Sequence, residues 1–182
     1  MNKKELRRKY LQIRNSIPNR EEKDRRILSF LMTYINDRHH CVGIYASFNG
    51  EADTYAIMEK LLSRGLKTAV SKTYPDHLQF FEIRHLEDLC VENPYGYKEP
   101  EESYPIEKKD IDLMIVPGVC FDIEHNRVGF GKGYYDRYLA DYKGDIIGIC
   151  YEEQISDAII DTDEHDIKIP VIITDKKIRV LS

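Results

Sequence analysis

Glycines and charged side chains suited to binding a polyphosphate lie together over residues 127–136. Three glycines alternate in Gly-Phe-Gly-Lys-Gly at 129–133, Arg127 precedes them, and Asp136 follows in the first turn of an expected helix. Glycine lets the backbone approach an anion and point several N–H groups at it. A helix N-terminus adds partial positive charge, and Arg127 and Lys132 add full charges. The spacing therefore predicts an anion site.

Asp136 would be repelled by a bound phosphate unless a cation lay between them, and Mg²⁺ favours carboxylate and phosphate oxygens. The segment matches neither common nucleotide loop, because Gly133 rather than Ser or Thr follows Lys132 and the G-x-G-x-x-G spacing is absent. A glycine-rich turn between a strand and a helix, with no ligand, is the simpler alternative.

The segment also resembles a known family. Pro-Gly-Val-Cys-Phe-Asp at 117–122, followed by Arg-Val-Gly-Phe-Gly-Lys-Gly-Tyr-Tyr-Asp at 127–136, looks like the signature of 5-formyltetrahydrofolate cyclo-ligases. One departure is His125, which stands where that family usually has glycine. We expect Asn126 to take the left-handed conformation of this turn instead.

The resemblance implies an enzyme that uses ATP and Mg²⁺ to convert 5-formyltetrahydrofolate to 5,10-methenyltetrahydrofolate, with release of ADP and phosphate. It implies catalytic roles for Lys132, Arg127 and Tyr151, and a magnesium site at Asp136 and Asp166. The implied ATP-binding residues are Lys3, Lys4, Arg7, Arg127, Val128, Gly129, Phe130, Gly131, Lys132, Gly133, Tyr134 and Tyr135. The implied folate-binding residues are Arg7, Ala46, Glu51, Phe130, Gly131, Lys132, Gly133 and Tyr134.

Several of these residues have ordinary structural alternatives. Lys3 and Arg7 share one face of a basic helix, which could simply be solvated. Glu51 could favour the N-terminus of the helix that follows it, and Tyr151 could be a half-buried packing residue at a strand end. Residues 163–166, Asp-Glu-His-Asp, lack the second His or Cys that a zinc site needs.

The elements that must position these residues follow from the hydrophobic pattern. The run at 111–116 is apolar without alternation, which is typical of a strand buried in a parallel sheet. Helices are expected at 3–16, 19–36, 54–64 and 134–142, and strands at 41–46, 67–71, 78–83, 111–116, 146–150, 171–174 and 177–181. We predict a three-layer α/β fold, with a mainly parallel sheet flanked by helices and an N-terminal helical pair, as a single domain over 1–182.

Composition restricts the class of protein further. The 182 residues are 42% hydrophobic and 32% charged with a net charge of −5, which argues against a nucleic-acid partner. Cys41, Cys120 and Cys150 lie in apolar runs and are expected to be buried thiols. No membrane-length apolar run or signal-peptide core is visible. We expect a cytoplasmic monomer without nucleic-acid or membrane partners. The rival functions are a nucleotide-binding module without catalysis and a nucleic-acid protein using the basic helix.

Overall fold

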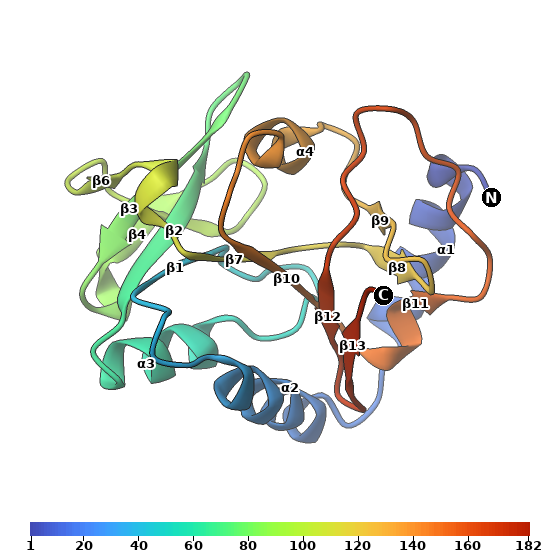
Figure 1. Ribbon diagram of the computed structural model, residues 1–182, viewed down its shortest axis with the longest axis horizontal. Helices are drawn as coiled ribbons and strands as arrows, with labels where there is room; N and C mark the ends of the chain where they lie inside the picture. The colour runs from blue at the N-terminus through green and yellow to red at the C-terminus, as the bar shows by residue number, and fades with distance from the viewer.

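The computed structural model describes all of residues 1–182 and shows an α/β fold around an eight-stranded sheet (Figure 1). The spatial order of the strands is β13-β12-β10-β7-β1-β2-β3-β6, and the run from β12 to β2 is parallel. The strands span β1 Cys41–Ile44, β2 Lys67–Thr73, β3 Leu78–Ile83, β6 Pro105–Ile106, β7 Leu113–Val116, β10 Asp145–Ile149, β12 Val171–Ile173 and β13 Ile178–Val180.

The central strand β7 shows why its apolar run does not alternate. Leu113 and Ile115 belong to the core cluster on one face of the sheet, whereas Met114 and Val116 belong to the cluster on the other. Both faces are covered, so side chains of both parities are buried. The parallel sheet and its central strand were predicted correctly.

Helices form the two outer layers. Helix α2 (Arg20–Tyr34) and helix α3 (Tyr55–Ser63) cover one face, with Leu31 and Leu61 in the core there. Helix α4 (Tyr134–Leu139) lies on the opposite face with Leu139 against the sheet (Figure 1). Helix α4 has six residues and is shorter than the predicted segment 134–142.

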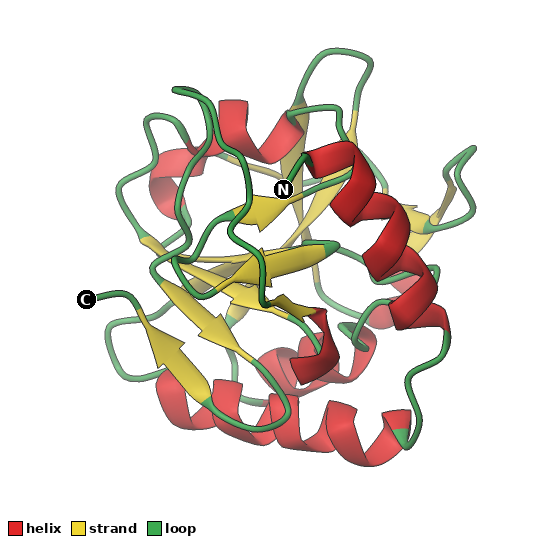
Figure 2. Cartoon of the chain, turned by 90° about the vertical axis from the view of Figure 1, so that its right-hand side faces the viewer, coloured by secondary structure: helices red, strands yellow, loops and turns green.

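Helix α1 (Lys3–Asn15) packs elsewhere. Its Leu6 and Tyr10 lie against Val119, Val128 and Ile160, next to a small sheet of order β11-β8-β9. Figure 2 shows α1 running at an angle to α2 rather than alongside it. The N-terminal helical pair therefore exists, but only α2 packs on the large sheet. The small sheet consists of β8 Cys120–Asp122, β9 Arg127–Val128 and β11 Ile155–Ser156.

A two-stranded sheet and three short 3₁₀ helices complete the chain. They lie largely in segments expected to be loops. Their bounds are β4 Leu89–Glu92, β5 Lys98–Pro100, η1 Leu86–Asp88, η2 Lys108–Asp110 and η3 Glu152–Gln154.

Candidate active site

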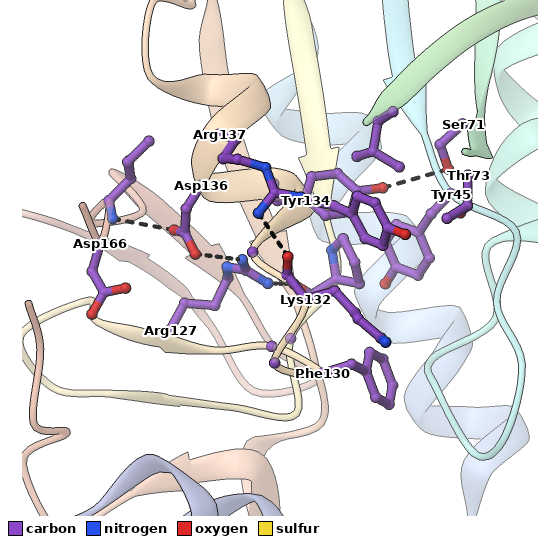
Figure 3. Close-up of a pocket in the computed structure, with 18 of the residues that line it drawn as sticks. Tyr45, Ser71, Thr73, Arg127, Phe130, Lys132, Tyr134, Asp136, Arg137 and Asp166 are labelled. Carbon is purple, nitrogen blue, oxygen red and sulfur yellow. Dashed lines mark hydrogen bonds and ion pairs between the residues drawn. The ribbon is translucent and has the colours of Figure 1, made fainter. Parts of the chain in front are cut away.

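A cavity of about 1220 Å³ opens at the carboxyl ends of the central strands. Its walls come from distant parts of the chain: helix α1, the segment after β1, the end of β2, the β9–α4 loop, and residues 163–167. Open α/β sheets bind ligands at this edge because the strand-to-helix loops converge there. Figure 3 shows Lys132, Phe130, Tyr134 and Asp166 around this space.

The β9–α4 loop presents its backbone N–H groups without protein partners. None of the N–H groups from Gly129 to Asp136 donates a hydrogen bond to another protein group. Gly131 and Gly133 adopt the left-handed region, with φ of 97° and 69°. Because buried or crowded N–H groups need an acceptor, such a run is suited to several anionic oxygens of one ligand.

Carbonyl groups hold this loop in place. The Gly129 carbonyl accepts from Arg7 Nε at 2.7 Å, and the Lys132 carbonyl accepts from Arg137 Nη1 at 2.8 Å. Arg7 also lies beside Gly131, so the first helix is part of the anion site. The loop is therefore anchored through its acceptors, which leaves its donors available.

The two cations of the motif differ in their surroundings. Lys132 is exposed and its ammonium group has no hydrogen-bond or ion-pair partner. Arg127 is buried, and its guanidinium donates to the Pro117 carbonyl at 2.9 Å and lies 3.5 Å from Asp136. Burial lowers the pKa of Arg127 and the Asp136 carboxylate opposes that change. Gly129 allows this packing, because a Cβ there would lie 2.8 Å from Arg127 Nη1.

Asp136 and Asp166, the two residues expected to hold magnesium, both line the cavity (Figure 3). Asp136 has only long contacts, at 3.5 Å to Arg127 and 3.3 Å from the Ile167 N–H. Asp166 accepts through one oxygen from Lys3 and from the Asp163 N–H. No group of three or more His, Cys, Asp or Glu side chains converges on a metal site. Two carboxylates with spare acceptor capacity fit Mg²⁺, which completes its shell with water and phosphate oxygens.

Glu51 also lines the cavity, in the loop between β1 and α3. Its carboxylate accepts from the Phe48 N–H at 3.0 Å. Burial raises the pKa of Glu51 to about 7, although the Phe48 hydrogen bond and the Arg14 charge act in the opposite direction. A half-buried carboxyl group that lines a cavity and titrates near neutral pH is a candidate for ligand recognition.

Comparisons with known proteins agree with this geometry. The model of the 5-formyltetrahydrofolate cyclo-ligase family matches residues 1–175. The chain belongs to that family. It is 34% identical over 159 residues to 5-formyltetrahydrofolate cyclo-ligase from Saccharomyces cerevisiae, covering 72% of this chain and 74% of that protein. It is 30% identical over 149 residues to the Escherichia coli K12 cyclo-ligase, covering 76% and 80%.

The fold gives the same result. The NMR structure of 5,10-methenyltetrahydrofolate synthetase from Aquifex aeolicus superposes with a TM-score of 0.84 at 30% identity, over 98% of this chain and 92% of that one. The chain is thus an enzyme of the cyclo-ligase family, an ATP-dependent ligase of folate one-carbon metabolism. None of its helices has the length and apolar character needed to cross a membrane.

Most of the residues predicted for a cyclo-ligase site do meet at this cavity. Those lining it are Lys3, Lys4, Arg7, Ala46, Glu51, Arg127, Gly129, Phe130, Gly131, Lys132, Gly133, Tyr134, Tyr135, Asp136 and Asp166.

Two predicted site residues lie outside the cavity. Val128 is fully buried in the core beneath α1, so its side chain is unavailable to a ligand. Tyr151 is 1% exposed, and its hydroxyl donates to Asp24 at 2.7 Å behind the β1–α3 loop. The structure therefore does not support a direct catalytic role for Tyr151.

The turn before Arg127 also differs from expectation. His125, not Asn126, takes the left-handed conformation, with φ of 66°. Its ring Nδ1 donates to the Ile169 carbonyl at 2.7 Å, while Asn126 is bonded to Asp122. The hydrogen bond fixes the imidazole ring and helps to offset the steric cost of a side chain at this φ.

Sequence reasoning missed an aromatic wall of the cavity. The ring of Phe48 lies 4.7 Å from that of Tyr97 and 6.0 Å from that of Phe130, and Tyr95 lines the same cavity. The Tyr97 hydroxyl lies 2.8 Å from the Thr73 hydroxyl. The only local signal of this wall is the Pro-Tyr-Gly-Tyr run at 94–97, which places two tyrosines in a short polar segment.

Proposed function

We propose that the enzyme converts 5-formyltetrahydrofolate and ATP to 5,10-methenyltetrahydrofolate, ADP and phosphate, with both substrates bound in the cavity described above. Support comes from one observation above the others. The open N–H groups of residues 129–136 and the unpartnered Lys132 share this cavity with the buried carboxyl of Glu51. One end suits a polyphosphate, and the other suits a ligand that offers hydrogen-bond donors.

The reaction needs a better leaving group than hydroxide. Transfer of the γ-phosphoryl group to the formyl oxygen breaks the bond to ADP and leaves an iminium-like carbon bearing a phosphate. The N10 amine of the same folate then forms a bond to that carbon and loses its proton. The carbon–oxygen bond breaks, and the phosphate leaves with the electron pair. Holding the amine close to the carbon supplies much of the rate.

Positioning and charge neutralisation are what phosphoryl transfer chiefly demands of a protein. In this proposal the N–H groups of 129–135 and the side chains of Lys4, Arg7 and Lys132 bind the triphosphate. Lys132 balances charge on the transferred group, and the buried Arg127 orients the loop and Asp136. A Mg²⁺ ion held by Asp136 and Asp166, with Lys3 beside them, would neutralise further phosphate charge when bound.

The folate is assigned to the opposite side of the cavity. Ala46 and Glu51 line the cavity, and the Phe48 ring beside them lies 6.0 Å from the Phe130 ring of the 129–136 loop. The Glu51 carboxylate can accept from ring N–H groups, and aromatic side chains offer flat faces for stacking. The proposal places Gly131, Gly133 and Tyr134 between the two substrates, where the formyl oxygen and the γ-phosphate meet.

An absorbance assay for methenyl-folate tests this function. Product should form when ATP, Mg²⁺ and 5-formyltetrahydrofolate are all present, and should fall to background when any one is omitted. ADP should appear in equal amount to the methenyl product. Binding of ATP without any product under the complete conditions would instead support a nucleotide-binding module without catalysis.

A further inference from the structure

The loop carrying Glu51 is held from behind by three charged side chains of the N-terminal helices. Arg14 Nη2 donates to the Asn49 carbonyl at 2.8 Å, and Arg20 Nη1 donates to the Gly50 carbonyl at 2.8 Å. Asp24 accepts from the Asp53 N–H at 3.3 Å. Arg14, Arg20 and Asp24 do not line the cavity, whereas the loop's Phe48 and Glu51 do.

These three side chains are linked to one another. Arg20 also donates to the Arg14 carbonyl, which joins the end of α1 to the start of α2. The Tyr151 hydroxyl donates to Asp24 at 2.7 Å, and the Arg20 guanidinium lies 5.2 Å from the centre of the Tyr151 ring. We name Arg14, Arg20, Asp24 and Tyr151 the loop cradle. Within the cradle, the buried Tyr151 hydroxyl bonds Asp24, which in turn accepts from the loop's Asp53 N–H.

Within the cradle, the burial of Arg14 is unfavourable in free energy. Its side chain is 0% exposed, and its Nε and Nη1 have no hydrogen-bond partner. Burial of a cation with unmet donors is unfavourable unless nearby negative charge compensates. Burial lowers the pKa of Arg14, and the Glu51 carboxylate is the main group that opposes this. The cradle and Glu51 are therefore coupled by charge as well as by the backbone of the loop.

We propose that Arg20 and Tyr151 are positioning residues that fix the 47–54 loop and thereby set the affinity for folate but not for ATP. The proposal rests on the proposed function for the identity of the ligand. Arg20 bonds the Gly50 carbonyl and Tyr151 bonds Asp24, and neither side chain bonds a residue of the 129–136 loop. Arg14 differs from both, because its guanidinium also lies 5.8 Å from the centre of the Phe130 ring in that loop. A merely structural role would lower stability without distinguishing the two substrates.

Arg20→Met and Tyr151→Phe test the cradle, because each removes polar contacts and keeps most of the side-chain volume. Arg64→Met and Tyr142→Phe are matched controls. Arg64 Nη1 donates to the Met32 carbonyl at 3.3 Å, and the Tyr142 hydroxyl donates to the Ile111 carbonyl at 2.8 Å, so neither bonds the cradle or the 47–54 loop. Each protein is measured by calorimetry for 5-formyltetrahydrofolate and ATP binding, by thermal unfolding, and by hydrogen exchange of the peptide covering 47–54.

We expect Arg20→Met to raise the folate Kd about tenfold and Tyr151→Phe about threefold to fivefold, as loss of one or two buried hydrogen bonds implies. The ATP Kd should stay within about twofold. The tenfold change expected for folate corresponds to about 1.4 kcal/mol of binding free energy. Exchange over 47–54 should become faster in both variants and stay unchanged in the controls. Arg20→Lys, which can still donate to one carbonyl, should recover part of the folate affinity.

Equal weakening of both ligands would overturn the proposal. So would unchanged exchange over 47–54 with a melting temperature lowered as in the controls. Neither readout requires turnover. A wild-type enzyme that binds folate but makes no methenyl product would refute the proposed function, while hydrogen exchange and binding would still decide whether the cradle positions the loop.

Discussion

The 129–136 and 47–54 loops both line the cavity, but they differ in which of their polar groups are bonded within the protein. The 129–136 loop is tied down by its carbonyl groups and keeps its N–H groups open. In the 47–54 loop both N–H donors and carbonyl acceptors are bonded. Ser47 and Thr54 bond each other, the Phe48 N–H donates to Glu51, and two carbonyls accept from arginines.

This difference matches two kinds of ligand. Open N–H groups can be shared among the many equivalent oxygens of a phosphate chain, so the loop tolerates changes in how that chain lies. The 47–54 loop, whose Glu51 carboxylate and two carbonyls are held by hydrogen bonds, offers instead a fixed carboxylate and fixed rings, which suit a rigid heterocycle. The comparison therefore predicts that substitutions in one loop affect one substrate.

Lys132→Ala should have the largest effect. It removes the unpartnered cation of the open loop, and kcat/KM for ATP should fall about 10- to 100-fold, the size of one lost charge-assisted contact. The melting temperature should not change, because Lys132 is exposed and bonds nothing. Lys143→Ala, an exposed lysine outside the cavity, is the control for loss of charge. Unchanged ATP kinetics with a lowered melting temperature would contradict an anion role for Lys132.

Asp136→Asn and Asp166→Asn probe the metal at the edge of the open loop. Each should raise the Mg²⁺ concentration for half-maximal rate about tenfold, since each removes one charged oxygen ligand. If the two share one ion, the double variant should show non-additivity of about 0.5–3 kcal/mol. A magnesium titration of the two single variants and the double variant measures this. Half-saturation that stays at the wild-type value in both single variants would end the metal assignment.

Glu51→Gln changes the 47–54 loop and should weaken the binding of folate only. The wild-type kcat/KM for folate should rise with pH through about 7 as this carboxyl ionises, because its pKa is raised to about 7 by burial. The Gln variant should lose that pH dependence and be about fivefold weaker at pH 8. Tyr45 and Tyr135 also lie near Glu51, but burial raises the pKa of both, so they stay protonated.

The same variant should be more stable than the wild type at high pH. A carboxyl whose pKa is higher in the folded state than in the unfolded state loses stability as pH rises between those two values. For Glu51 this window runs from 4.5 to about 7. Thermal unfolding should therefore show Glu51→Gln above wild type at pH 8 and close to it at pH 5. A lower melting temperature at pH 8 would show that Glu51 stabilises its loop as an ion.

Tyr97→Leu should give the smallest effect. It removes one ring from the aromatic wall and the hydroxyl contact with Thr73, so KM for folate should rise about two- to threefold, equivalent to ~0.5 kcal/mol. KM for ATP should be unaffected. Tyr104→Leu, which changes a half-exposed tyrosine outside the cavity, serves as the control. An equal rise in both KM values would show that the wall supports the cavity as a whole.

Local patterns predicted the strands and the position of the Gly-rich loop because both depend on nearby residues. The strand expected at 78–83 is β3, with the same bounds, and the buried run at 111–116 contains β7. The Gly-rich loop was found because its conformation requires glycine at 131 and 133. These features depend on residues that are adjacent in the sequence.

Features set by distant partners were not predictable in the same way. The strands β8, β9 and β11 have two or three residues each and exist through pairing with one another. Tyr151 stands at a strand end, where a ligand site was plausible, but its position relative to Asp24 depends on how α2 packs. Arg14 reads as one more base on an exposed helix, and nothing local indicates that it is fully buried.

The packing of α1 has a consequence for how the chain folds. Its buried residues Leu6 and Tyr10 contact Val119, Val128 and Ile160, all more than 100 positions later in the sequence. During synthesis, helix α1 is therefore made long before the residues that it packs against. It stays exposed until most of the protein has been made. Closing so long a loop is slow relative to forming the β2–β3 hairpin. The N-terminal wall of the cavity should be the last to assemble, so that catalytic competence arrives only at the end of folding.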